Sequence, residues 1–273
     1  MGPPLPVTPA AAALLSVLAI SLASLAGALT LSLGRARLER TISLLVAFAV
    51  GAMLGGALLH LIPESYAALG GGPETGLLVL AGVLAFFVLE KFLHWRHQHG
   101  VPEALEGASG HVGHHHHHHH GVDAAAPFAL VNLVGSVAHK VVDGAIVAAA
   151  YMVSIQTGLV TTLAVMLHEI PAEIGNFGVL VYGGYPVRKA LLYNFVAGLG
   201  GLIGAGLVLT LGAGVEGLAD WLLPVTAGAF LYVAGSDLIP ELNRRHSYPA
   251  TKAVGQLVMI LLGIGVMAVP LFW

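Results

Sequence analysis

Long apolar stretches, separated by short polar segments, run through nearly the whole chain. A membrane core about 30 Å thick takes roughly 20 helical residues to cross. Eight apolar stretches fit that length, at about residues 10–33, 41–68, 75–95, 127–153, 157–182, 188–212, 220–240 and 251–272. The pattern predicts an all-α protein of eight transmembrane helices, a single transmembrane domain over residues 1–273 with one long loop at 96–126.

The composition agrees with a membrane protein. Of the 273 residues, 57% are hydrophobic and only 9% are charged. The formal net charge of −3 carries little information here, because steering by net charge is a property of soluble surfaces. The chain has no cysteine, so any metal ion must be held by nitrogen and oxygen donors.

Basic residues predict the orientation. Ten of the eleven fall in alternate connections: Arg35, Arg37, Arg40, Lys91, Arg96, Arg188, Lys189, Arg244, Arg245 and Lys252. Cytoplasmic loops are enriched in Lys and Arg, so both termini are predicted to lie outside and the loop 96–126 in the cytoplasm. The first arginine follows the first apolar stretch, which argues against a cleavable signal peptide. The expected location is the inner or plasma membrane of a bacterium or archaeon.

An internal repeat relates the second and seventh helices. Residues 51–64 align without gaps on residues 228–241, with eight of fourteen positions identical, and both copies end in Leu-Ile-Pro-Glu. The two helices are predicted to run in opposite directions, so the repeat is inverted, as is typical of secondary transporters. A chance match of Gly, Ala and Leu is the alternative, but the shared Pro-Glu ending is not an effect of composition.

The repeat also places polar residues symmetrically. His60 and Glu64 in helix two correspond to Asp237 and Glu241 in helix seven. One interpretation makes them the outer and inner stations of a transport pathway. The other is that the two glutamates cap helix ends at the membrane interface, where the neighbouring prolines help to end the helices. The two deeper residues, His60 and Asp237, favour the pathway.

Two polar clusters lie near the middle of helices four and five. His139 and Asp143 are four residues apart and share one helix face, and the second cluster runs from His168 to Glu173. Ionisable side chains are costly in a membrane unless they are paired, hydrated or metal-bound. Two such clusters at one depth predict a divalent-metal site, with a structural His–Asp hydrogen bond as the alternative. The candidate ligands on these helices are His139, Asp143, His168, Glu169, Glu173 and Asn176.

These motifs resemble the ZIP family of divalent metal transporters. Residues 139–144 and 168–173 are similar to the branch whose fourth helix reads HNxxDG and whose fifth reads HEIPHE, and residues 58–64 and 227–234 also look like the family's. The resemblance implies eight helices with both termini outside, a metal path lined by helices two, four, five and seven, and uptake of zinc or a similar ion into the cytoplasm. It carries four residues over as ligands: His139, Asp143, His168 and Glu169.

Two positions depart from the family pattern. Lys140 stands where the family has Asn, and Ala172 stands where it has the second His of HEIPHE. The ammonium of Lys140 can replace a second cation, or it can snorkel along another face or neutralise Glu173. The missing imidazole at 172 can be made good by Met53, by Glu173, by a backbone carbonyl that Pro171 leaves free, or by water. A loss of transport is also left open.

The predicted loop is rich in histidine. Its candidate metal-binding residues are His111, His114, His115, His116, His117, His118, His119 and His120. Clustered imidazoles bind zinc, copper or nickel without needing a fold, so the loop is interpreted as a cytoplasmic metal sink. The alternative is a purification tag built into a loop. Histidines outside the run, such as His94 and His97, favour a natural loop.

The predicted function is that of a secondary transporter for a divalent transition-metal ion, with zinc first and iron, manganese or cadmium as ions that accept similar donors. No enzymatic activity and no catalytic cofactor are predicted. The alternative of an intramembrane metalloprotease needs a His-Glu-x-x-His motif, and Ala172 breaks it. A metal sensor without transport is the third interpretation. The expected partners are divalent ions and the lipid bilayer, with no nucleic acid and with a homodimer allowed.

Overall fold

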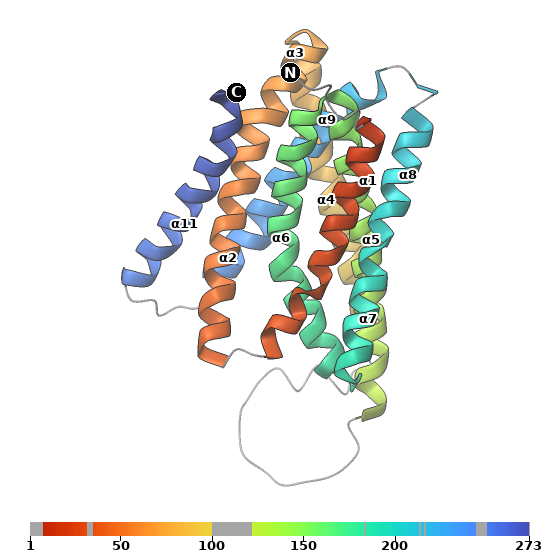
Figure 1. Ribbon diagram of the computed structural model, residues 1–273, viewed down its shortest axis with the longest axis vertical. Helices are drawn as coiled ribbons and strands as arrows, with labels where there is room; N and C mark the ends of the chain where they lie inside the picture. The colour runs from red at the N-terminus through yellow and green to blue at the C-terminus, as the bar shows by residue number, and fades with distance from the viewer. Residues whose placement is uncertain are drawn as a thin grey trace, which may run out of the picture.

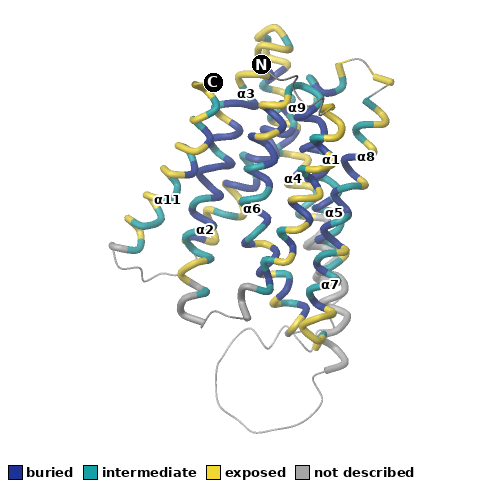
Figure 2. Tube along the Cα trace, in the orientation of Figure 1, coloured by how far each residue is buried: buried dark blue, intermediate teal, exposed yellow. Residues whose placement is uncertain are grey.

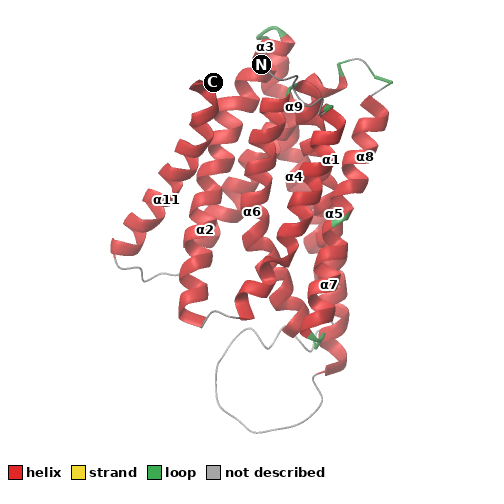
Figure 3. Ribbon diagram, viewed as in Figure 1, coloured by secondary structure: helices red, strands yellow, loops and turns green. Residues whose placement is uncertain are grey.

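The computed structural model describes residues 8–31, 35–99, 122–182, 184–212, 214–215, 217–243 and 250–272. Throughout this part of the chain the regular structure is helical and no strand occurs (Figure 3). The elements are α1 (Pro9–Ala23), η1 (Ser24–Leu31), α2 (Arg35–Gly55), η2 (Gly56–Leu61), α3 (Ile62–Leu69), α4 (Pro73–His99), α5 (Val122–Val153), α6 (Ile155–Tyr182), α7 (Val187–Gly198), α8 (Gly200–Gly212), α9 (Leu218–Tyr232), η4 (Val233–Leu238), α10 (Ile239–Asn243), α11 (Ala250–Ala268) and η5 (Val269–Phe272).

Seven segments of the described chain are long and apolar enough to cross a membrane. They are Pro9–Ala28, Arg40–Leu69, Pro73–Lys91, Leu133–Val153, Val187–Gly212, Leu218–Asn243 and Lys252–Phe272. Helix α6 is more polar in its middle, but its 28 residues span about 42 Å at 1.5 Å per residue. It runs along the full height of the bundle (Figure 1). The predicted all-α, polytopic membrane fold is confirmed.

The basic residues of the described helices gather at one end of the bundle, the lower end in Figure 1. Successive membrane-crossing segments alternate in direction, so the start of α2, the end of α4, the start of α7 and the start of α11 all meet there. These helix ends carry Arg40, Lys91, Arg188 and Lys252. We call this the basic end. The first turn of α1 and the last turn of η5 lie at the opposite end (Figure 1), which we call the far end.

The two copies of the sequence repeat adopt the same local structure. Helix α2 passes into the π-helix η2, and α9, which runs the other way, passes into the π-helix η4 at the matching register. Pro63 and Pro240 follow these segments at equivalent positions. A proline ring displaces the carbonyl four residues earlier and offers no N–H, so the preceding turn widens from α to π hydrogen bonding. The inverted repeat is therefore a structural repeat.

Both copies also use a glycine at the same position to approach a neighbouring helix. A Cβ on Gly51 of α2 would overlap the carbonyl of Ile260 in α11, and a Cβ on Gly228 of α9 would overlap the carbonyl of Val79 in α4. In lipid, helices associate through close packing of this kind, because the tails are as apolar as the side chains. The repeat thus builds two similar helix pairs, α2 with α11 and α4 with α9.

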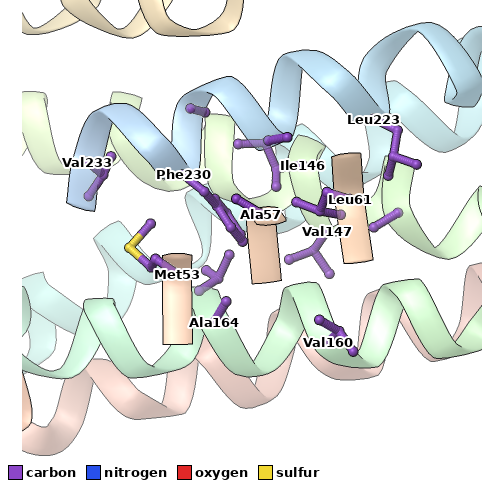
Figure 4. Close-up of a cluster of buried hydrophobic side chains, with 14 of the residues drawn as sticks. Met53, Ala57, Leu61, Ile146, Val147, Val160, Ala164, Leu223, Phe230 and Val233 are labelled. Atoms are coloured by element: carbon purple, nitrogen blue, oxygen red, sulfur yellow. The ribbon is translucent and has the colours of Figure 1, made fainter. Parts of the chain in front are cut away.

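The interior of the bundle is apolar near the far end. Met53, Ala57 and Leu61 are buried between α6 and α9 (Figure 4). Exposed apolar side chains cover the outer helices, and α11 is exposed along much of its length (Figure 2). This distribution fits a chain whose outer surface contacts lipid tails.

Candidate metal centre

Close packing between α5 and α8 fixes the depth of the first polar cluster. A Cβ on Gly144 would overlap the carbonyl of Gly201, and a Cβ on Gly204 would overlap that of Val141. The two backbones are therefore in direct contact along this stretch. His139 and Asp143, one turn apart on α5, lie beside that contact.

Helix α6 presents the second cluster to α5. The Nδ1 atom of His168 lies 3.4 Å from the carbonyl oxygen of Ala164, one turn earlier, which leaves Nε2 to face α5. Pro171, three residues later, has no N–H and frees the carbonyl of Leu167 inside the same helix. Near the end of the cluster, Asn194 of α7 donates from Nδ2 to the backbone oxygen of Glu173 at 3.1 Å. These contacts hold the polar stretch of α6 at the level of His139.

Four side chains from α5 and α6 converge at this level. The Nε2 atom of His139 lies 3.6 Å from Oδ2 of Asp143 and 3.8 Å from Oε1 of Glu169. The Nε2 atom of His168 lies 3.8 Å and 3.6 Å from the same two oxygens. One donor atom from each of the four residues fits within 4.8 Å of all the others. Donors about 2.0–2.2 Å from a tetrahedral ion stand roughly 3.3–3.6 Å apart, so this spacing suits a shared cation better than direct hydrogen bonds.

Three of these donor atoms, Oε1 of Glu169 among them, have no hydrogen-bond partner within the described protein. Oδ2 of Asp143 and Nε2 of His168 are buried, and neither makes a hydrogen bond within the described protein. An unsatisfied buried polar atom costs about 1–3 kcal/mol. A bound cation would remove that cost for both atoms at once, because both point at the same space. The unpaired atoms thus indicate a site that is built for an ion.

Lys140 lies next to the cluster and is buried. Its ammonium forms ion pairs with the carboxylates of Glu169 and Glu173 on α6. The side chain is 4% exposed, so it does not snorkel to a membrane interface. Of the alternatives that the sequence left open, neutralisation of Glu173 is realised, and Glu169 shares the ammonium.

A cavity of about 1190 Å³ leads from the cluster toward the basic end. His139, which is 28% exposed, stands at its inner limit together with His168 and Glu169. Leu38 near the start of α2 and Val181 near the end of α6 line its other limit, and both belong to helix ends at the basic end. The donors are therefore reached from the basic end.

Several predicted residues line this cavity. Asn176 donates from Nδ2 to Oγ of Ser136 at 3.2 Å and faces the cavity one turn beyond Glu173. Asp237 and Glu241 lie on its wall near the basic end. Ala172 also lines it and is exposed, so the position where the family has histidine faces the same space as the cluster.

Other predicted residues lie elsewhere. Met53 packs in the apolar core, next to Ala164 and Val233 (Figure 4). His60 is buried and donates from Nε2 to the carbonyl oxygen of Met267 at 2.6 Å. Glu64 is exposed in the first turn of α3, toward the far end. The loop residues His111 and His114 to His120 lie outside the described residues.

One further ionisable pair, which the sequence motifs did not predict, lies in the cavity. Glu90 of α4 lines the cavity and accepts a hydrogen bond from the hydroxyl of Tyr232 on α9. Because it is an acidic residue inside a membrane-crossing segment, Glu90 carried the signal that marks a functional position. In the sequence, however, Glu90 stands next to Lys91, and these two charged residues together resemble the polar end of a helix.

Comparison with known proteins places the chain among metal transporters. The family model described as ZIP Zinc transporter matches residues 7–270. Zinc transporter ZIP13 of Pongo abelii is 34% identical over 237 residues, which cover 82% of this chain and 65% of that protein. Zinc transporter YKE4 of Saccharomyces cerevisiae is 29% identical and covers 85% and 71%, and human zinc transporter ZIP5 is 34% identical and covers 98% and 60%. The chain spans about two thirds of the length of these relatives.

Proposed function

The chain belongs to the ZIP zinc transporter family, and from this we propose that it carries divalent metal ions, zinc first, across the membrane. The relatives compared above are all named zinc transporters, which supports zinc as cargo. Transport of iron, manganese or cadmium stays a prediction, because the same nitrogen and oxygen donors accept these ions.

We assign the ion-binding site to His139, Asp143, His168 and Glu169. The observation that carries the assignment is the pair of buried donors, Oδ2 of Asp143 and Nε2 of His168, that face one another without a hydrogen bond. Two imidazoles and two carboxylates form the borderline donor set that zinc prefers. Water from the cavity can complete the coordination beside Ala172, where no ligand side chain is present.

The proposed direction of release is toward the basic end. We assign that end to the cytoplasm from the distribution of Lys and Arg, and the cavity joins it to the proposed ion site. Asp237, Glu241 and Glu90 line the exit, where their charges attract a departing cation. On the far side, the entry route would pass His60 and Glu64. Both termini outside, a bacterial or archaeal membrane, and a homodimer stay predictions.

The competing functions have less support. A metalloprotease needs a second zinc-binding imidazole one turn after His168, and Ala172 offers none. A sensor that binds without transporting is not favoured by the relatives, all of which are named zinc transporters. Peptide cleavage by the reconstituted protein, or metal binding without flux, would favour these alternatives.

Zinc uptake into proteoliposomes tests the proposal. His139→Ala, Asp143→Ala and Glu169→Ala should each abolish saturable flux, since each removes a donor atom from the proposed ion site in a membrane interior. Asp220→Ala, an acidic residue at the far end of α9, is the matched control and should transport normally. Size-exclusion profiles and helical circular dichroism establish that each variant is folded. Parental transport rates in any two of the three site variants would overturn the assignment.

A further inference from the structure

Lys140 is the one buried cation in the described part of the chain. The buried acids there are Asp143, Glu169 and Glu173, each at most 5% exposed, and all three belong to the same cluster. The aliphatic part of Lys140 lies against α8. A Cβ built on Gly200 of α8 would stand 3.6 Å from the Cβ of Lys140. The packing of α5 on α8 thus holds the ammonium inside the bundle.

Glu169 divides its two oxygens between two kinds of partner. Oε1 lies 3.8 Å from His139 and 3.6 Å from His168, so it belongs to the proposed ion site. Oε2 contacts the ammonium of Lys140, which in turn contacts Glu173. The ammonium therefore occupies the space between Glu169 and Glu173, where two carboxylates would otherwise form the outline of another cation site.

The charges of the cluster give a stoichiometry. Three buried carboxylates and one buried ammonium leave two negative charges, with both imidazoles neutral as ligands. A single divalent ion neutralises them. A second divalent ion would leave an uncompensated double positive charge in a medium where unpaired charge is strongly disfavoured. Without the lysine, three negative charges would remain for the incoming metal.

From these contacts we propose that Lys140 acts as a tethered cation that restricts the transport site to one divalent ion. The inference rests on the proposed function, because it describes the same site. Lys140 fills the second cation position permanently and leaves Oε1 of Glu169 to the ion that moves. The site then gains and loses one divalent ion at a time, and the ammonium still compensates one of the two negative charges of the Glu169–Glu173 pair when no ion is bound.

Counting zinc ions bound to the purified full chain tests this inference. Bound zinc is measured by equilibrium dialysis and elemental analysis at saturating metal. Each protein is measured with Glu169 present and again as its Glu169→Ala form, and the second count is subtracted from the first. Ions held by the histidine-rich loop cancel in the difference, because the loop is identical in both. The difference reports only ions that depend on Glu169, the carboxylate common to both positions.

The variants remove the ammonium, keep its charge, or remove the whole ion pair. We expect about one ion for the parent and for Lys140→Arg, and about two for Lys140→Gln, which loses the charge and adds an oxygen donor. The double variant Lys140→Gln/Glu173→Gln should return to about one ion, since its charge again matches a single divalent cation.

The outcomes separate the two proposals. About two ions in the parent, or about one in a folded Lys140→Gln protein, would overturn the role of Lys140 and leave the metal site intact. No Glu169-dependent ion in the parent would instead overturn the proposed site itself. If Lys140→Gln does not fold, the parent count decides: a value that stays at about one at saturating zinc supports the tethered cation, and about two rejects it.

Discussion

The two halves of the bundle on either side of the metal centre are built from copies of one sequence pattern, yet one half is packed and the other is hollow. Toward the far end, Leu61 of η2 is fully buried in the apolar core (Figure 4), whereas its aligned counterpart Leu238 of η4 is only partly buried and lines the cavity. Toward the basic end, Asp237 of η4 is exposed on the cavity wall. The repeat is symmetric in its backbone and asymmetric in what surrounds it.

The aligned residues His60 and Asp237 show what this difference means. His60 is closed off by its hydrogen bond to Met267, whereas Asp237 faces a cavity that reaches the ion site. In a transporter with inverted repeats, alternating access arises when the two repeats exchange packed and open surroundings. Under the proposed function, the structure corresponds to the state in which the ion site is open toward the basic end.

Chemical labelling should give the largest contrast. The chain has no native cysteine, so Asp237→Cys and His60→Cys each provide a single thiol. Asp237→Cys should react with a polar maleimide on the order of 100-fold faster, because a buried thiol reacts only through local opening that costs roughly 3 kcal/mol. Glu64→Cys, exposed near the far end, is the control for general reactivity there. Equal rates at 60 and 237 would show that the halves are not distinguished in this way.

Stability should also distinguish the two aligned residues. His60→Ala removes a buried hydrogen bond and leaves the Met267 carbonyl unsatisfied, so the free energy of unfolding should fall by about 1–3 kcal/mol. Asp237→Asn keeps the side-chain shape on the cavity wall and should change the free energy of unfolding by less than about 0.5 kcal/mol. Thermal unfolding in detergent measures both. A larger loss of unfolding free energy for Asp237→Asn than for His60→Ala would contradict this prediction.

The acidic lining of the hollow half should affect transport more than stability. Glu90→Gln removes a negative charge from the cavity, and zinc flux should fall roughly two- to fivefold because release of the cation is less well guided. Tyr232→Phe removes the hydroxyl that contacts Glu90 and should have a smaller effect in the same direction. Glu74→Gln, at the far end of α4, is the matched control. An equal loss of zinc flux in Glu74→Gln and Glu90→Gln would show that the charge on the cavity wall is not responsible.

The loop should matter least for flux. Replacing His114 to His120 with alanine should leave the rate and the metal preference of transport unchanged, because the proposed ligands all lie in α5 and α6. The number of weakly bound zinc ions should fall, since clustered imidazoles bind zinc without a fold. Proteoliposome flux and dialysis measure the two quantities separately. Loss of flux in a folded variant would place the loop in the conduction path.

Local periodicity alone was enough to predict much of this protein. The apolar stretches gave the all-α membrane fold because crossing a bilayer demands a long helix with every backbone group bonded internally. The spacing of His139 and Asp143 put both on one face because the helical repeat is fixed. The alignment of residues 51–64 with 228–241 predicted the inverted repeat, and the shared proline accounts for matching π-helices at the same register.

Contacts between distant helices decided the rest. The partner of His60 lies 207 positions away, and nothing in the neighbourhood of His60 identifies it. Met53, a ligand candidate by sequence, packs in the core, while Glu90 lines the cavity. The pairing of Lys140 with Glu169 and Glu173 depends on how closely α5 approaches α6 and α8. Helix periodicity sets which residues share a face, but only tertiary packing determines what each face meets.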